Sequence, residues 1–410
     1  MDFTHTPKML ALQSQVRDFL DRHIVPAIPR WKQEVEAGAP HPAFMEDLKA
    51  LARSEGLWNL FLPGLHADEP GQALSNLEYA PLAEIMGRVM WASEVFNCSA
   101  PDTGNMEILH LFATPEQRER WLKPLLEGEI RSCFAMTEPD VASSDASNIQ
   151  TSIRRDGGDY VINGRKWFIS GAAHPHCRFA IVMGVTDPDN DRHRRQSMVI
   201  VPFDTPGLEI VRNIPVMRHL SAEGHCEIVL RNVRVPAENL IGEEGAGFAI
   251  AQARLGPGRI HHCMRSIGQC ELALELMCAR AAERKSFGRY LHEHGAVAEW
   301  IARSRIEIDQ ARLLVMRAAW LIDRHGAKGA AKEIAMIKAV APSLQTQVCD
   351  RAMQTFGAMG LSEDAPVADL WTWGRVLRIA DGPDEVHLAS VAKQEIREQS
   401  HKRAEAIRYL

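Results

Sequence analysis

A short acidic segment near the C-terminal end of the chain contains residue types that can transfer protons. It reads Arg378-Ile379-Ala380-Asp381-Gly382-Pro383-Asp384-Glu385-Val386-His387, with helix-forming sequence on both sides. Glycine and proline interrupt helices, and side chains on such breaks are often placed for binding or reaction. A carboxylate at the mouth of a cleft can act as a general base, whereas the same group on an ordinary loop is only a solvated charge. This loop is our first candidate site.

The length and composition indicate a multidomain globular enzyme. The chain has 410 residues, of which 24% are charged and 46% hydrophobic, and its formal net charge is −6. At about 150 residues per domain, this length predicts two to three domains. The acidic balance argues against a nucleic-acid partner, which would require a basic surface. The densest basic cluster, 192–195, follows the acidic run 187–191, so we expect a charged hairpin tip there.

The sequence also bears on location, redox state and metals. Residues 1–5 lack the apolar core of a signal peptide and no run of 18 apolar residues occurs, so we expect a cytoplasmic protein without a membrane span. The eight cysteines form no C-x-x-C pair, which favours reduced thiols. The pairs His174/His176 and His261/His262 lack further ligands at suitable spacing, so no metal site is predicted.

Hydrophobic spacing predicts an α+β protein with three domains: an N-terminal helical domain (1–130), a middle β domain (131–241) and a C-terminal helical bundle (242–410). Near the start, apolar residues repeat at the helical period and should end before Pro26; they are Leu12, Val16, Phe19 or Leu20, and Ile24. Thr114 precedes Pro115 and an acidic turn, which predicts a capped helix that runs through Lys123.

In the middle domain the period changes to two. The segment 160–170 predicts two short strands around an Asn163-Gly164 turn, because Asn-Gly is a strong hairpin signal. Further strands are expected at 179–182, 197–202, 208–211 and 226–235. After Gly242 the helical period returns, and two apolar stripes, 301–322 and 334–356, predict long bundle helices. The first should end at Gly326, and Pro342 should kink or split the second.

Several other segments have motif-like spacing along the chain. They are 136–145 (MTEPDVASSD), 163–171 (NGRKWFISG), 204–208 (DTPGL), 233–242 (VRVPAENLIG), 283–288 (ERKSFG) and 354–361 (QTFGAMGL). Taken with the loop around Asp381, they resemble the acyl-CoA dehydrogenase family, flavoenzymes that desaturate the α,β bond of acyl-coenzyme A thioesters. The resemblance covers residues 10 to 395. The runs 254–262 and 380–387 are most similar to the subfamily of family members ten and eleven.

The resemblance implies a bound FAD, and no dinucleotide-binding G-x-G-x-x-G is present for it. The cofactor would lie between the β domain and the C-terminal bundle. Hydroxyls and an aromatic ring would contact the flavin, and Arg284 would reach the pyrophosphate of a neighbouring subunit, where an arginine fork suits a diphosphate. The residues implied for FAD are Met136, Thr137, Ser143, Ser144, Phe168, Ser170, Arg284, Phe287, Gln354, Gly357, Pro383 and Glu385.

For the reaction, the resemblance places Asp381 at the position of the family's catalytic glutamate. Residues implied for the acyl-CoA substrate are Ser144, Arg259, Asp102 and Gly382. Some relatives carry the base near residue 258, but that residue is glycine here. The chain also departs from the family motifs at Ala358, Ala380 and Pro383, which replace glycine, tyrosine and threonine.

These observations predict FAD-dependent dehydrogenation of an acyl-CoA to the trans-2-enoyl-CoA, with Asp381 as base. An electron-transfer flavoprotein as acceptor and a dimer or dimer of dimers are implied by the resemblance. Two alternatives stay open. One is a flavin oxidase of the same fold, of the acyl-CoA or nitroalkane type, since oxygen access is not encoded in the motifs. The other is a non-catalytic helical interaction protein, which would lack bound flavin.

Overall fold

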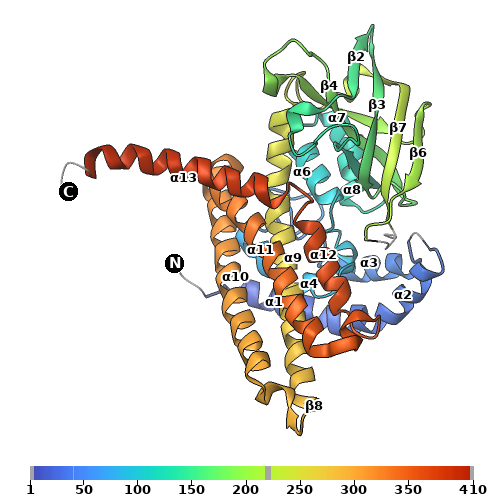
Figure 1. Cartoon of the computed structure of the whole chain (residues 1–410). Coiled ribbons are helices and arrows are strands. Elements are labelled where there is room, and N and C mark those ends of the chain that lie inside the picture. The colour runs from blue at the N-terminus through green and yellow to red at the C-terminus, as the bar shows by residue number, and fades with distance from the viewer. Residues whose placement is uncertain (1–3, 40, 218–222, 407–410) are drawn as a thin grey trace. The chain divides into compact units, whose positions relative to one another are not determined.

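The computed structural model describes residues 4–39, 41–217 and 223–406 (Figure 1). Contacts between Cα atoms divide them into two compact parts. We call residues up to 17, 76–90 and 259 onward the helical part, and residues 18–75 and 91–258 the mixed part. Each part is described by itself. No helix among the described residues is long and apolar enough to cross a membrane.

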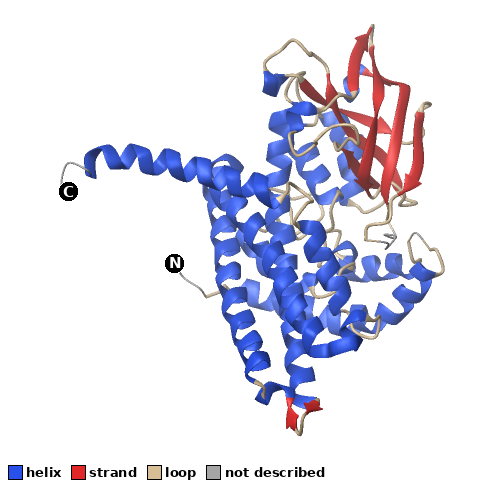
Figure 2. Cartoon of the chain, in the orientation of Figure 1, coloured by secondary structure: helices blue, strands red, loops and turns tan. Residues whose placement is uncertain are grey.

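The helical part consists of long helices and one small hairpin (Figure 2). Its helices are α4 (Asn76–Gly87), α10 (Gly295–Gly329), α11 (Ala331–Phe356), α12 (Val367–Leu377), α13 (Asp384–Ala406) and most of α1 (Pro7–Phe19) and α9 (Gly247–Glu283), with 3₁₀ turns η7 (Leu291–Glu293) and η8 (Gly357–Leu361). The last two residues of α1 and residues 247–258 of α9 belong to the mixed part. Strands β8 (Lys285–Ser286) and β9 (Arg289–Tyr290) form the hairpin. Helix α11 packs against α10, α12 and α13. The distal half of α13 extends beyond the bundle (Figure 1).

The two apolar stripes predicted from the sequence are the buried faces of α10 and α11. Gly326 adopts φ 67° and ψ 174°, which interrupts α10 where the sequence places its end. Of the two outcomes predicted for Pro342, the split does not occur, because α11 runs through this residue as one helix. Pro342 is itself buried in the bundle, so tertiary packing outweighs the local cost of an interior proline.

Helix α4 receives its N-terminal cap from a distant residue. The carboxylate of Asp323, on α10, accepts hydrogen bonds from the backbone N–H groups of Asn76 (2.9 Å) and Leu77 (2.9 Å). The Asn76 side-chain amide donates to the same carboxylate at 2.8 Å. A carboxylate at a helix N-terminus satisfies unpaired N–H groups and complements the helix dipole. The cap therefore ties α4 to α10.

The mixed part contains short helices and a sheet. Its helical elements are η1 (Leu20–Ile24), η2 (Val25–Ala27), α2 (Ile28–Glu36), α3 (Phe44–Ser54), α5 (Ala92–Val95), α6 (Asp102–Phe112), α7 (Pro115–Gln117), η3 (Arg118–Leu122), α8 (Lys123–Leu126), η4 (Ala146–Asn148), η5 (Arg192–Arg194) and η6 (Ala237–Asn239). The helical path continues past Pro26 through a π turn and a 3₁₀ turn, because Pro26 occupies an early position where its missing N–H costs little. Thr114 and Gln117 form the predicted cap as a reciprocal capping box.

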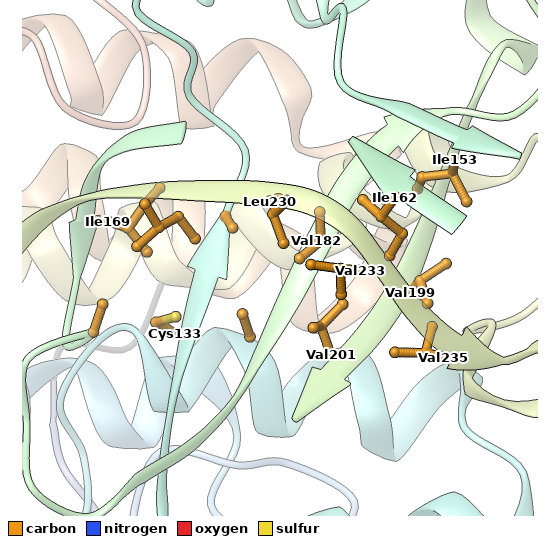
Figure 3. Packing of buried hydrophobic residues seen from close by; sticks show 14 of the residues in the cluster. Cys133, Ile153, Ile162, Ile169, Val182, Val199, Val201, Leu230, Val233 and Val235 are labelled. Carbon is orange, nitrogen blue, oxygen red and sulfur yellow. The ribbon is translucent and has the colours of Figure 1, made fainter. Parts of the chain in front are cut away.

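Seven strands form one sheet in the mixed part: β1 (Arg131–Ala135), β2 (Ser152–Asp156), β3 (Asp159–Ser170), β4 (Cys177–Val185), β5 (Gln196–Pro202), β6 (Leu208–Asn213) and β7 (His225–Pro236). Their order is β1-β4-β2-β3-β7-β6, and β5 also pairs with β4. Apolar side chains from these strands, among them Ile153, Ile162, Val199 and Val233, pack together in a buried cluster (Figure 3). The basic residues 192–194 lie on the β4–β5 connection, as predicted.

The predicted hairpin at Asn163-Gly164 is wrong, because β3 runs straight through both residues. The hairpin turn lies earlier, at Gly157-Gly158, and joins β3 to β2, which the sequence did not reveal. Gly164 has a different role. A Cβ there would lie 2.2 Å from Thr151 Oγ1, so glycine allows a close approach at an irregular point of the β3–β7 ladder.

Candidate functional site

The loop that carries Asp381 connects α12 to α13 and is closed on itself. The Arg378 guanidinium donates from Nε to Asp384 Oδ2 at 2.7 Å, and the backbone N–H of Asp384 donates to the Arg378 carbonyl at 3.2 Å. Asp384 is the first residue of α13, where a carboxylate also complements the helix dipole. These contacts fix the six residues 378–383 between two helix ends.

The backbone of Asp381 is held in an uncommon conformation. Its φ is 56°, in the left-handed region. Its carbonyl accepts hydrogen bonds from Arg259 Nε and from His387 Nε2, both at 3.2 Å. Gly382 follows with φ 103°, and a Cβ there would lie 2.8 Å from His387 Nε2. Strained backbone of this kind clusters at functional sites, so the geometry singles out Asp381 within its loop.

Charge around the loop is controlled by burial. Burial lowers the pKa of His387 to about 4, so this imidazole is neutral and donates to the Asp381 carbonyl through Nε2–H. Burial also lowers the pKa of Arg259, which Asp381 partly offsets. Lys338 is buried and donates to the Leu377 carbonyl, and burial lowers its pKa as well. The Asp381 side chain retains 26% exposure, so a ligand can reach its carboxylate.

Gly258 is the position at which some relatives carry the catalytic base. It lies on α9, directly before Arg259. A Cβ built on Gly258 meets no atom within 4 Å. Space is therefore open around this residue.

Asp102, predicted to bind the substrate, is buried on α6 and pairs with Arg131. Its Oδ1 also accepts from the Ser132 N–H at 2.7 Å and the Ser132 hydroxyl at 2.6 Å.

The loop that begins at Met136 is anchored by a buried ion pair between Lys166 and Glu138. Lys166 Nζ donates to the Met136 carbonyl (2.8 Å), to Glu138 Oε1 (2.9 Å) and to the Met183 carbonyl (2.7 Å). Burial lowers the pKa of Lys166 to about 8. Burial would raise the pKa of Glu138, but Lys166 and the hydrogen bonds it receives hold that pKa below its ordinary value. The Ser143 hydroxyl accepts from the Glu138 N–H at 2.9 Å, which closes the loop.

Phe168 projects from a bulge in β3. The β3–β7 register shifts between Lys166 and Ile169, and Phe168 has φ 51° and 44% exposure. The Trp167 N–H donates to the Thr137 carbonyl at 3.0 Å, which joins this strand to the Met136 loop. Bulges re-aim side chains and are frequent next to active sites. The bulge directs the Phe168 ring outward, so that the ring is not buried in the core.

Ser170 ends the same strand, and its Oγ lies 2.9 Å from His225 Nδ1. Within the mixed part, the structure thus brings Met136, Thr137 and Phe168 together, with Ser143 closing the loop. Ser144 is exposed. An exposed aromatic ring joined to this loop suits a flavin, because a ring can cover the apolar face of the cofactor.

The remaining predicted cofactor residues belong to the helical part. Arg284 directly precedes the β8–β9 hairpin and Phe287 lies in its turn, where it is 97% exposed with φ 50°. Gln354 is exposed near the end of α11, and Gly357 follows that helix with φ 67°. Pro383 is half-buried beside Asp381, and Glu385 is exposed on the first turn of α13. An exposed ring of this kind is suited to contact another molecule.

Sequence reasoning missed a group of potential metal ligands in the mixed part. One ligand atom each from His41, Glu94 and His174 lies within 4.8 Å of the others. However, Lys49 Nζ (2.9 Å) and Arg131 Nη1 (2.7 Å) already pair with Glu94 Oε1. His174 Nδ1 accepts from the His176 N–H at 3.1 Å, so its Nε2 carries the proton that points to Glu94. The arrangement is an ion network without a free metal position.

Three family models match the chain. They describe the acyl-CoA dehydrogenase N-terminal domain (residues 6–129), middle domain (133–233) and C-terminal domain (245–396). A Mycobacterium tuberculosis protein named probable acyl-CoA dehydrogenase FadE2 is 56% identical over 99% of this chain and 100% of its own length. Mouse acyl-CoA dehydrogenase family member 10 is 53% identical over 98% of this chain, which spans 38% of that longer protein.

Solved structures agree with these relatives. A protein of Mycobacterium abscessus assigned to the acyl-CoA dehydrogenases has a TM-score of 0.92 and 48% identity, covering 97% of this chain and 100% of the other. The FAD complex of PigA has a TM-score of 0.82 and 25% identity, covering 96% and 99%. Since the described residues around Phe168 also suit a flavin, FAD is the cofactor of this fold here. The chain is an oxidoreductase and belongs to the acyl-CoA dehydrogenase family.

Proposed function

We propose that the chain catalyses the α,β-dehydrogenation of an acyl-CoA thioester, with Asp381 as the general base. The observation that carries the proposal is the held conformation of Asp381. Its carbonyl is bound by Arg259 and His387, while its carboxylate remains 26% exposed. A carboxylate on a fixed backbone can stand at a defined position against a bound substrate, which is what proton abstraction requires.

In the reaction, the Asp381 carboxylate accepts the α-proton of the thioester as the C–H bond breaks. The electron pair of that bond becomes part of the α,β double bond, and the β-carbon loses hydride. Bound FAD supplies the hydride acceptor. A thioester α-hydrogen is weakly acidic, so the site must also polarise the thioester carbonyl. By resemblance to the family, the backbone N–H of Asp381 donates to that carbonyl, and Gly382 leaves room for the substrate to approach.

The Met136 loop and Phe168 have the supporting role of holding the flavin. Lys166 holds the Met136 carbonyl, which fixes the start of the loop proposed to contact the flavin. The exposed ring of Phe168 would cover the flavin and exclude water from it, which would strengthen the electrostatic interactions at the flavin. Gln354, Gly357 and Glu385 are proposed for the rest of the cofactor.

The proposal is tested by anaerobic rapid mixing of the FAD-loaded protein with a panel of acyl-CoAs. We expect flavin bleaching with at least one of them. Asp381→Ala should bind FAD and acyl-CoA but bleach roughly 10²- to 10⁴-fold more slowly, the usual cost of losing a general base. Asp381→Glu should keep partial activity, since it offers the same carboxylate one methylene further out. If Asp381→Ala bleaches at the wild-type rate, the base is elsewhere.

The same panel addresses substrate breadth. The side chain of aspartate is shorter than glutamate by one methylene, roughly 1.5 Å, and space around Gly258 is open. We therefore expect branched or hydroxylated acyl chains to be accepted as well as straight ones. Turnover of straight-chain acyl-CoAs far above every branched or hydroxylated one would contradict this expectation.

The electron acceptor is proposed to be an electron-transfer flavoprotein, and a flavin oxidase is the competing outcome. After bleaching, admission of oxygen should reoxidise the flavin only slowly, whereas added electron-transfer flavoprotein should do so rapidly. Rapid peroxide formation would assign the chain to the oxidases. A cytoplasmic location stays a prediction that cell fractionation would check.

A further inference from the structure

A histidine on α9 lies close to the carboxylate of the proposed base. His262 Nε2 lies 3.5 Å from Asp381 Oδ2, and the two side chains retain 24% and 26% exposure. His262 comes four residues after Gly258 and three after Arg259, so the three lie on neighbouring turns of one helix. Catalytic hydrogen bonds are often long in ligand-free structures and tighten when a substrate is bound, so 3.5 Å is within the working range of this contact.

The tautomer of His262 is set by its other nitrogen. Arg265 Nη2 lies 3.2 Å from His262 Nδ1. A guanidinium is always protonated and can only donate, so Nδ1 must accept and the ring proton resides on Nε2. This Nε2–H points to Asp381. With Nδ1 accepting from Arg265, the ring is the neutral Nε2–H tautomer.

The other polar groups packed around Asp381 are engaged in different contacts. Arg259 and His387 bind its carbonyl, and Lys338 binds the carbonyl of Leu377. Cys263 is a neutral thiol, because burial raises its pKa to about 12. His261 is buried on α9 with its ring against Tyr79, and burial holds its pKa well below the ordinary value. Arg259 and Lys338 also interact electrostatically with Asp381, whereas His262 places a ring nitrogen 3.5 Å from Asp381 Oδ2.

We propose that His262 is a positioning residue for Asp381: its Nε2–H donates to Oδ2 and so directs Oδ1 toward the α-hydrogen of the substrate. The inference rests on the proposed role of Asp381 as base. In the reaction the α C–H bond breaks and an O–H bond forms at Oδ1. His262 does not take this proton, since Nε2 already carries one and Nδ1 faces Arg265. The hydrogen bond therefore orients the carboxylate and stabilises its charged form.

The test compares His262→Leu and His262→Gln as FAD-loaded full-length proteins in anaerobic rapid mixing. His262→Leu removes the donor and should slow the limiting rate of flavin bleaching about 10- to 100-fold, the scale of a misplaced catalytic group. The acyl-CoA dissociation constant, taken from the concentration dependence, should change less than about twofold, because the contact is made to the base and not to the substrate. His262→Gln keeps an N–H donor and should recover most of the rate.

The pH profile separates positioning from a structural role. Without the donor the carboxylate loses stabilisation of its charged form, so the acidic limb of the bleaching rate should move to higher pH in His262→Leu. His262→Gln should keep the wild-type profile. His325→Leu, on the exposed surface of α10, is the matched control and should match wild type in rate, profile and FAD content. If His262→Leu has a reduced FAD content, His262→Asn takes its place in the test, because the asparagine amide is too short to reach Oδ2. The same slower bleaching and the same shift of the acidic limb are then expected.

The outcomes distinguish this inference from the proposed function. If His262→Leu bleaches at the wild-type rate with an unmoved profile while Asp381→Ala does not bleach, the positioning role is overturned and the base assignment stands. If His262→Gln bleaches as slowly as His262→Leu, the proposed hydrogen bond from residue 262 to Asp381 Oδ2 is overturned. If Asp381→Ala bleaches at the wild-type rate, the proposed function fails first.

Discussion

His174 shows how a buried ion network in the mixed part makes stability depend on pH. The residue is 4% exposed and lies beside Glu94, which also pairs with Lys49 and Arg131. Burial lowers the pKa of His174 to about 4, against an ordinary value of 6.5. Burial alone would raise the pKa of Glu94, but Arg131 and Lys49 hold it well below the ordinary value. The native network thus contains a neutral imidazole and a charged carboxylate.

The first prediction concerns acid stability. Between pH 4 and 6.5 the unfolded chain binds a proton at His174 that the folded chain does not, so the free energy of unfolding rises with pH in this window. This histidine should account for about 2 kcal/mol of stability lost between pH 7 and 5. His174→Gln, which can still donate to Glu94, should lose correspondingly less over that range. Denaturant titration at both pH values measures the difference.

Other groups titrate in the same proteins and serve as the internal reference. His387, whose pKa burial lowers to about 4, adds to the loss in both. Burial raises the pKa of Glu223 to about 7, which acts in the opposite direction in both. An equal pH dependence in wild type and His174→Gln would show that His174 is not the titrating group.

For single residues, the sequence identifies functional candidates that belong to motifs. It does not identify those whose role depends on tertiary contacts. Asp381 is identified because a carboxylate, glycine and proline break a helical pattern. His262 and His387 have no such signal. Their roles depend on which faces of α9 and α13 contact the Asp381 loop. Hydrophobic periodicity alone does not say whether a histidine on a helix is a site residue or a packing residue. Lys166 reads as an ordinary strand lysine until its three buried acceptors are known.

At the scale of elements, strand β3 depends on one glycine. A side chain at Gly164 would meet Thr151 Oγ1 at 2.2 Å and Thr151 Cβ at 2.7 Å. We predict that Gly164→Ala destabilises the protein by about 1–3 kcal/mol, the cost of overpacking a tight site. Because β3 also carries Phe168 and Ser170, the variant should retain FAD less well. Thermal unfolding and the flavin-to-protein absorbance ratio measure both effects.

Gly158 provides the matched control on the same hairpin. Its Cβ would meet nothing within 4 Å and its backbone is not left-handed. Gly158→Ala should therefore change stability by less than about 0.5 kcal/mol, as for an ordinary surface substitution. A Gly164→Ala protein as stable as Gly158→Ala would mean that the Thr151 contact relaxes without cost.

The misplaced hairpin shows where local signals fail. Asn163-Gly164 and Gly157-Gly158 are both turn dipeptides, and the sequence does not say which one reverses the chain. Long-range pairing decides it, since Asn163 pairs with Ser152 of β2 and its Oδ1 accepts from the Asn232 N–H of β7 at 2.8 Å. Strands with clear alternation, and the α10 and α11 stripes, were predictable because their periodicity reflects burial directly.

At the scale of the whole molecule, Arg284 and Phe287 indicate association. An aromatic ring that is 97% exposed at a hairpin tip is costly in water unless another surface covers it. We predict a homodimer or a dimer of dimers, as is typical of the family, with Arg284 binding the FAD of a neighbour. Arg284→Ala should release FAD on dilution several-fold faster than wild type. Light scattering and the flavin-to-protein ratio measure assembly and retention.

Arg289, also exposed and on the same hairpin, is the control. Arg289→Ala changes the charge of the tip equally but lies outside the family motif, so it should retain FAD as wild type does. A monomer that keeps full FAD occupancy would contradict the prediction. The order of α, β and α regions was predictable from the sequence, whereas the boundaries between the three predicted domains remain predictions.

The cap on α4 has a consequence for how the chain is made. Asp323 is 247 residues beyond Asn76, so α4 leaves the ribosome long before its cap is synthesised. At roughly 5–20 residues per second, the delay is about 12 to 50 seconds. During that time the side chains that α4 later buries, among them Tyr79, Leu82 and Met86, have no bundle to enter. The nascent chain must therefore be protected from association at this segment until α10 has emerged.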